Sequence, residues 1–165
     1  MDAYSTANWG AVFSAITGAT AALTGLLFVA LSINLSQVIK GPGLIPRAVE
    51  VLVLLVSALL ISTLLLMPGQ PPESAAIEII SIAVTEVILL GIIQARAPRR
   101  VMGVSTANFA GRVAGAHSGP LLLLVGGATM LLHGGGGLYW VVPGLLAAMV
   151  AAIIGAWVML VEIVR

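Results

Sequence analysis

Glu86 is the residue whose position most needs a chemical explanation, because it interrupts the apolar run at residues 81–90, SIAVTEVILL. If this run belongs to a helix that starts near Ala75 and crosses a membrane, the Glu86 carboxyl group, counted at 1.5 Å per residue, lies about 16 Å into a hydrocarbon core roughly 30 Å thick. Placing an acid at that depth costs about 2.5 to 3.5 kcal/mol. Glu86 therefore needs a hydrogen-bond partner, a water molecule or a proton.

One interpretation of this acid is an ion or proton route across a membrane. Glu78 lies toward one side, Glu86 at the centre and His117 toward the other side. Histidine titrates near neutral pH and a buried carboxyl group favours its protonated form, so both residue types suit a relay. Eight helical residues separate the two acids by about 12 Å, so water would have to bridge them.

The alternative interpretation is a clasp between two helices. Steps of three and four residues place a row of polar side chains on one face of the helix that carries Glu86. The first helix has a polar side of its own at a similar depth. A protonated Glu86 that donates to this side would fix how the first and third spanning helices dock. The candidate residues for the route or the clasp are Glu86, Glu78, Thr85, Ser81, Thr20, Thr24 and His117.

The elements that must position these groups follow from the composition of the chain. Of its 165 residues, 60% are hydrophobic and only 8% are charged, and the mean hydropathy is +1.17. A soluble domain carries about a quarter charged residues, so the chain is predicted to be an integral membrane protein in contact with the lipid bilayer. Because a crossing takes roughly 20 helical residues, the apolar runs predict an all-α single domain over 1–165. Five spanning helices are expected, at about 11–38, 48–67, 75–95, 113–132 and 139–163.

The basic residues predict the orientation of this bundle. Lys and Arg are retained on the cytoplasmic side of short loops, and with five crossings all seven fall on one face. The N-terminus is then outside and the C-terminus cytoplasmic. A four-crossing arrangement with one re-entrant glycine-rich segment would spoil this segregation. The seven residues are Lys40, Arg47, Arg96, Arg99, Arg100, Arg112 and Arg165. Glu50 and Glu162 are expected at the same rim, as exposed ion pairs that mainly hold register.

Small residues in regular steps predict where the helices pack. Inside lipid, close backbone approach through small side chains drives helix association. Three stripes stand out, one on the first helix and one on each of the last two, which is more than a small bundle needs, so a homo-oligomer is expected. The residues are Gly18, Ala21, Ala22 and Gly25 on the first helix, Gly111, Gly115 and Gly119 on the fourth, and Ala147, Ala151 and Gly155 on the fifth.

Most classes of chemistry are disfavoured. The chain has no cysteine and no G-x-S-x-G, Walker A or H-E-x-x-H motif, so we expect no enzyme activity and no cofactor. A net charge of +1 gives no field that would gather nucleic acid. Glu73 and His133 lie on the two outer turns, but two ligands without a recognisable spacing are too few to predict a metal site.

The run AALTGLLFVALSINL, residues 21–35, and the stretch 47–70 resemble a group of small bacterial multi-pass membrane proteins. These proteins are mostly uncharacterised and common in actinobacteria, and some are labelled modulators of a membrane-bound AAA protease. The resemblance implies a bacterial cytoplasmic (inner) membrane and a membrane-protein partner, and it brings no catalytic residue. We therefore expect an oligomeric structural or regulatory partner within the bilayer. The alternative is a small homo-oligomeric ion or proton channel or transporter that uses Glu86.

Overall fold

The structure is a computed structural model, which describes residues 3–41, 43–96 and 106–164. In this part of the chain every regular element is a helix. The order is a 3-10 turn η1 (Thr6–Asn8), then α1 (Gly10–Ile33), α2 (Leu35–Lys40), α3 (Leu44–Leu64), α4 (Pro72–Arg96), α5 (Thr106–Leu131) and α6 (Leu138–Val164). Five of them, all except η1 and α2, are long and apolar enough to cross a membrane. The predicted all-helical fold with five spans is confirmed.

Three boundaries differ from the prediction by four residues or more. The first segment was expected as one helix but is interrupted at Asn34, whose backbone has a non-helical φ of −103° and ψ of 18°. The Asn34 amide Nδ2 donates to the Ala30 carbonyl oxygen at 2.9 Å, which it shares with the Asn34 backbone N–H. Helix α3 begins at Leu44 and contains Pro46, since proline is tolerated in the first turn of a helix. Helix α5 begins at Thr106, seven residues before its apolar run.

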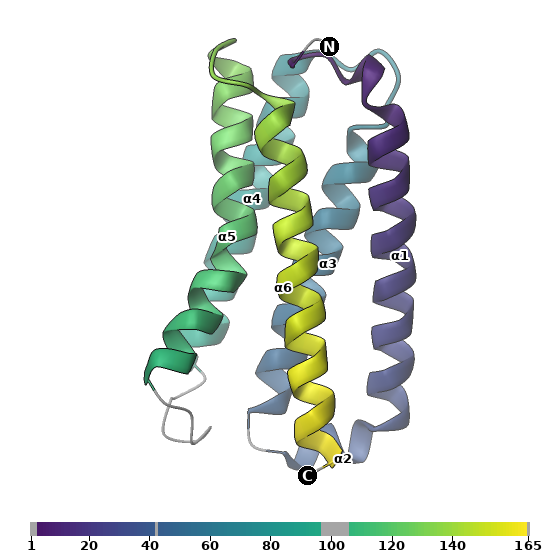
Figure 1. Ribbon diagram of the computed structural model, residues 1–165, viewed down its shortest axis with the longest axis vertical. Coiled ribbons are helices and arrows are strands. Elements are labelled where there is room, and N and C mark those ends of the chain that lie inside the picture. The colour runs from purple at the N-terminus through teal and green to yellow at the C-terminus, as the bar shows by residue number, and fades with distance from the viewer. Residues whose placement is uncertain (1–2, 42, 97–105, 165) are drawn as a thin grey trace.

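Four of the helices form a closed ring, and α1 lies outside it. Each of α3, α4, α5 and α6 packs against its two neighbours in the order α3, α4, α5, α6 and back to α3. Helix α1 packs against α3 and only marginally against α6 (Figure 1). The share of buried residues reflects this arrangement, because it reaches 56% in the apolar window of α3 but only 17% in that of α1.

Glycines bring α5 and α6 close together. A Cβ atom added to Gly119 would lie 2.9 Å from the Ala148 backbone nitrogen, and one added to Gly144 would lie 3.1 Å from the Gly119 carbonyl oxygen. Such distances leave no room for a side chain on either helix. Residues with a Cβ atom at these positions would push the helices apart, so this contact depends on glycine.

The two ends of the described chain lie at opposite ends of the bundle (Figure 1). At one end the Leu138 N–H donates to the Ala3 carbonyl oxygen at 2.9 Å, and at the other end Arg47 pairs with Glu162. An odd number of crossings requires this separation. Lys40 and Arg96 lie at the same end as Arg47, as predicted, whereas Arg99, Arg100 and Arg165 lie outside the described residues. Which end faces the cytoplasm stays a prediction.

Candidate functional site

Glu86 is fully enclosed in the bundle. Its side chain extends from α4 toward α3, is 1% exposed, and lies within interaction range of Ser57. The Ser57 hydroxyl, however, donates to the carbonyl oxygen of Val53 at 2.8 Å in its own helix. Among the described residues, neither Glu86 carboxyl oxygen has a hydrogen-bond partner. The predicted position of an acid buried in the bundle is confirmed, but its predicted partners are not those present.

The predicted clasp between the first and third spanning helices is wrong, because α1 packs against α3 and not α4. Thr20 is completely buried, yet its hydroxyl donates to the Ile16 carbonyl oxygen at 2.7 Å, and Thr24 donates to Thr20 in the same way. Among the described residues, α1 instead makes a hydrogen bond to α3 from Thr17 Oγ1 to Ser62 Oγ, at 2.9 Å. Sequence periodicity locates a polar face but does not identify the helix opposite it.

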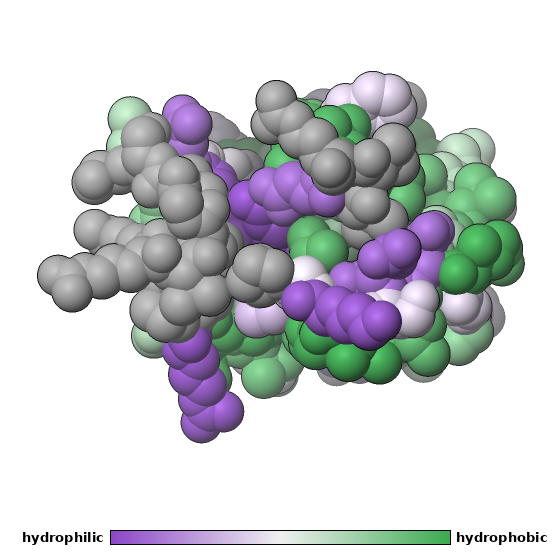
Figure 2. Space-filling view, turned by 90° about the horizontal axis from the view of Figure 1, so that it is seen from below, coloured by the Kyte–Doolittle hydropathy of each residue, from purple (hydrophilic) through white to green (hydrophobic). Residues whose placement is uncertain are grey.

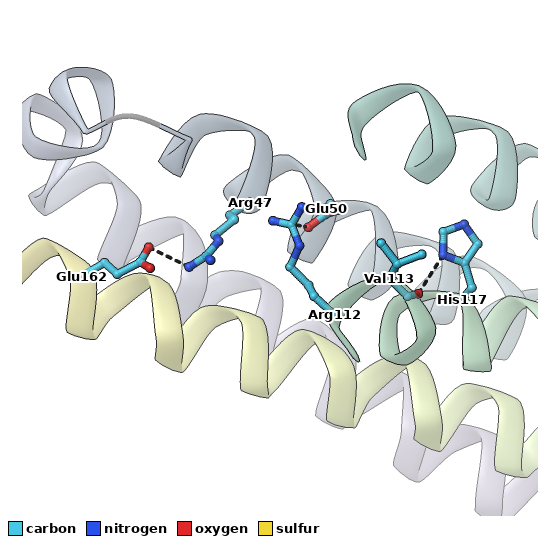
Figure 3. A network of polar contacts seen from close by, with 6 residues as sticks. All are labelled: Arg47, Glu50, Arg112, Val113, His117 and Glu162. Carbon is cyan, nitrogen blue, oxygen red and sulfur yellow. Dashed lines mark hydrogen bonds and ion pairs between the residues drawn. The ribbon is translucent and has the colours of Figure 1, made fainter. Parts of the chain in front are cut away.

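The other residues of the predicted route do not converge on Glu86. Glu78 accepts a hydrogen bond from Gln70 Nε2 at 2.6 Å, near the start of α4. Ser81 and Thr85 are exposed and donate to carbonyl oxygens of their own helix. His117 Nδ1 lies 2.9 Å from the Val113 carbonyl oxygen of α5 (Figure 3). Each of these polar groups thus has a hydrogen-bond partner in or near its own helix, and none of them is a partner of the Glu86 carboxyl group.

The structure instead brings together four charged side chains from three helices. Arg47 Nη1 of α3 lies 2.6 Å from Glu162 Oε2 of α6, and Arg112 Nη1 of α5 lies 3.6 Å from Glu50 Oε2 of α3 (Figure 3). These residues were expected at an exposed rim, but Arg47 is 8% and Glu50 only 5% exposed. Helix α5 covers them on one side and α6 on the other. The Arg112 guanidinium also lies 5.1 Å from the centre of the Phe109 ring.

A cavity of about 740 Å³ lies beside these charges, between α3, α5 and α6. All four charged residues line it at one end, and apart from Asn108 the other lining residues are apolar or small. Two of the lining residues, Gly111 and Gly115, have nothing within 4 Å of the place where a Cβ atom would stand, so they leave space rather than fill a contact. Figure 2 looks onto this end of the bundle, where hydrophilic side chains gather among the helix ends and apolar ones surround them. The spacing of Arg47 and Glu50, three residues apart on one helix face, was the sequence signal for this site.

The predicted packing stripes are only partly used within the chain. Gly119 makes the close contact with α6 described above, and a Cβ atom on Gly155 would lie 2.9 Å from Val51 Cγ2 of α3. Ala147 and Ala151 are half-buried, whereas their neighbours Ala148 and Ala152 are completely buried against the ring. Of the predicted α6 stripe, Gly155 therefore packs inside the chain, whereas at the other two positions the fully buried small residues are the next ones along, Ala148 and Ala152.

No group of three potential metal ligands occurs among the described residues. His133 Nε2 and Glu73 Oε1 do approach to 3.4 Å at the outer turns, but both side chains are exposed.

Comparisons with protein-family models, with curated proteins and with solved structures found no match to this chain. The family resemblance of residues 21–35 and 47–70 stays a prediction.

Proposed function

We propose that this integral membrane protein is non-enzymatic and works as a structural or regulatory subunit of an assembly in a bacterial inner membrane. Its partner helix docks on the N-terminal half of α1. The observation that carries this proposal is the position of α1, which lies outside the ring and has the smallest buried share of the five spanning helices. A helix held by one neighbour has most of its surface available to another chain.

The composition of this surface supports a protein partner over lipid. Lipid-facing helix surfaces need no small residues, whereas helix–helix interfaces in membranes are enriched in them. In the C-terminal half of α1 the exposed residues include Leu26, Phe28, Val29 and Ile33, as suits a lipid-facing surface. In the N-terminal half, residues 10–21, every exposed residue except Val12 is small, and this small surface continues to Ala22 and Gly25. The small exposed residues are Ala11, Ser14, Ala15, Gly18, Ala19, Ala21, Ala22 and Gly25.

The proposed partner is a second copy of the chain. Two such faces can meet at Gly18 and Gly25, where nothing lies within 4 Å of an added Cβ atom, so the approach of a second backbone is unobstructed. A symmetric dimer places the same surface on both sides of the contact, which requires a self-complementary face. A stripe of alanine and glycine satisfies that requirement without any charge pairing.

The oligomeric state tests this proposal. Counting photobleaching steps of a fluorescently labelled protein at low density in vesicles should give more than one subunit per spot. Gly18→Leu should convert these spots to single subunits, because the new side chain separates the two backbones. Gly91→Leu is the matched control, since Gly91 is an equally open glycine on α4. A chain that is already single, or a Gly18→Leu variant that stays oligomeric, contradicts the proposal.

A second candidate function is ion or proton conduction through Glu86. The observation that favours it is a completely buried carboxyl group with no hydrogen-bond partner among the described residues, because ionisable groups of this kind within a bilayer are costly and serve transport in many proteins. Vesicles that contain the protein and a pH-sensitive dye should lose an imposed proton gradient, and Glu86→Gln should prevent the loss. Gradients that persist over a range of protein densities and ions rule conduction out.

A further inference from the structure

The cavity between α3, α5 and α6 has two chemically different ends. Its charged end contains two arginines and two glutamates, so it carries no net formal charge. Its other end is lined by side chains such as Val51, Leu54 and Ile154. A ligand that matches both ends is amphiphilic, and the balance of charges disfavours one with a large net charge.

The depth of the cavity fits one leaflet of a bilayer. From Arg47 to Leu54 the wall formed by α3 covers seven residues, or about 10 Å, and from Glu162 to Ala151 the wall formed by α6 covers about 16 Å. Half of a hydrocarbon core is about 15 Å thick. The apolar end therefore accommodates part of an acyl chain when the charged end lies at the headgroup level. A volume of about 740 Å³ is also within the range of ordinary ligand sites.

Glu50 supplies the most specific signal in the cavity. Its Oε2 atom lies 3.6 Å from Arg112 Nη1, which is longer than a hydrogen-bonded ion pair. Its Oε1 atom is buried and has no hydrogen-bond partner among the described residues. A carboxylate on a residue that is only 5% exposed needs a donor, because an unmet acceptor costs the full desolvation of the group. The site is thus built for a ligand that brings an N–H or O–H donor to Oε1.

We propose that this cavity binds a phospholipid whose headgroup carries a primary ammonium group beside its phosphate. The ammonium donates to the Glu50 carboxylate, the phosphate accepts from the Arg112 guanidinium, and an acyl chain lies along Val51 and Leu54. Figure 3 shows Glu50 and Arg112 facing each other from α3 and α5, so one small zwitterionic headgroup reaches both. A choline headgroup has no N–H to donate, and a glycerol headgroup leaves the lipid anionic.

Lipid retention distinguishes these headgroups. The protein, purified in a mild detergent and mixed with dioleoyl lipids of one headgroup at a time, is examined by native mass spectrometry. Phosphatidylethanolamine should be retained about tenfold more strongly than phosphatidylcholine, because only its headgroup can donate a hydrogen bond to the Glu50 carboxylate. Equal retention of the two, or stronger retention of phosphatidylglycerol, overturns the proposal.

Variants assign the retention to this cavity. Glu50→Gln should remove the preference for ethanolamine over choline, whereas Glu73→Gln, an exposed carboxylate at the other end of the bundle, should keep it. Gly115→Leu fills the cavity without touching a charge and should lower the retention of every lipid. Circular dichroism confirms that each variant is folded. If both cavity variants are folded and retain lipid as the unaltered chain does, the lipid binds elsewhere and the proposal fails. Gly18→Leu, on α1, should leave the lipid preference unchanged, which separates this site from the proposed assembly.

Discussion

Arg47 and Glu162 lie 115 positions apart in the chain, yet their side chains meet at 2.6 Å and tie the first turn of α3 to the last turn of α6. The pair is asymmetric, because the Arg47 side chain is 10% exposed and that of Glu162 is 42% exposed. The arginine thus depends on its partner far more than the acid does. This contact closes the four-helix ring at the end of the bundle where the cavity lies.

The asymmetry predicts unequal effects of removing either charge. Glu162→Gln leaves a buried guanidinium without its counter-charge and should lower the free energy of unfolding by about 1–3 kcal/mol. Arg47→Gln leaves an acid that water or headgroups still reach, so the loss should be smaller. Thermal unfolding in detergent, followed by circular dichroism, gives the order of the two variants. Equal losses would contradict the argument from exposure.

Gly119 is predicted to be the one glycine of its stripe whose substitution destabilises the isolated chain. In Gly119→Ala the added methyl group meets the Ala148 backbone at about 2.9 Å and forces α5 away from α6, which should cost about 1–3 kcal/mol. Gly111→Ala is the matched control, because nothing lies within 4 Å of its added methyl group and the exchange favours helix formation. Unfolding in mixed detergent micelles measures both. A loss in Gly111→Ala as large as in Gly119→Ala would indicate that Gly111 packs against a second chain.

The five spans could be predicted because they depend only on the order of apolar and polar residues along the chain. Lipid requires about 20 apolar helical residues per crossing, and Pro–Gly turns separate the runs. The boundary errors arise where local chemistry overrides hydropathy. Pro46 lies inside α3 because a first turn tolerates it, and α1 is interrupted at Asn34, whose side chain bonds to the backbone.

The neighbours of each helix could not be predicted, because lipid gives no preferred direction to an apolar face. Thr20 and Glu86 were expected to meet at similar depths, but α1 packs against α3 and not against α4. The cavity was missed for a related reason. Small residues serve both close contact and empty space, and the sequence of Gly115 and Gly119 does not distinguish the glycine that lines the cavity from the one that packs.

The hydrogen bond between Thr17 and Ser62 predicts a small coupling between α1 and the ring. It is the side-chain hydrogen bond that joins α1 to α3 among those described, with an oxygen–oxygen distance of 2.9 Å. Such bonds contribute about 0.6 kcal/mol on average in membrane helices. A double-mutant cycle with Thr17→Val and Ser62→Ala should give a coupling free energy of this size. A coupling near zero would mean that apolar packing alone holds α1.

Glu86 is predicted to lower the stability of the fold that surrounds it. Its carboxyl group is enclosed between α3 and α4 with both oxygens unpaired among the described residues, so replacing it with an apolar side chain of similar length removes a desolvation cost. Glu86→Met should raise the free energy of unfolding by about 1–3 kcal/mol, and Glu86→Gln should change it less, because the amide remains a buried polar group.

Chemical unfolding of the reconstituted protein measures this gain in stability. The proton-flux assay on the same preparations then shows whether Glu86 serves transport. A stabilised Glu86→Met variant that no longer dissipates a proton gradient would show an acid kept for transport at the expense of stability, as functional sites often are. A stabilised variant of a chain that conducts nothing would leave the acid without a transport role. A destabilised variant would contradict the prediction itself, since it would mean that the carboxyl group forms an interaction that a methionine side chain cannot replace.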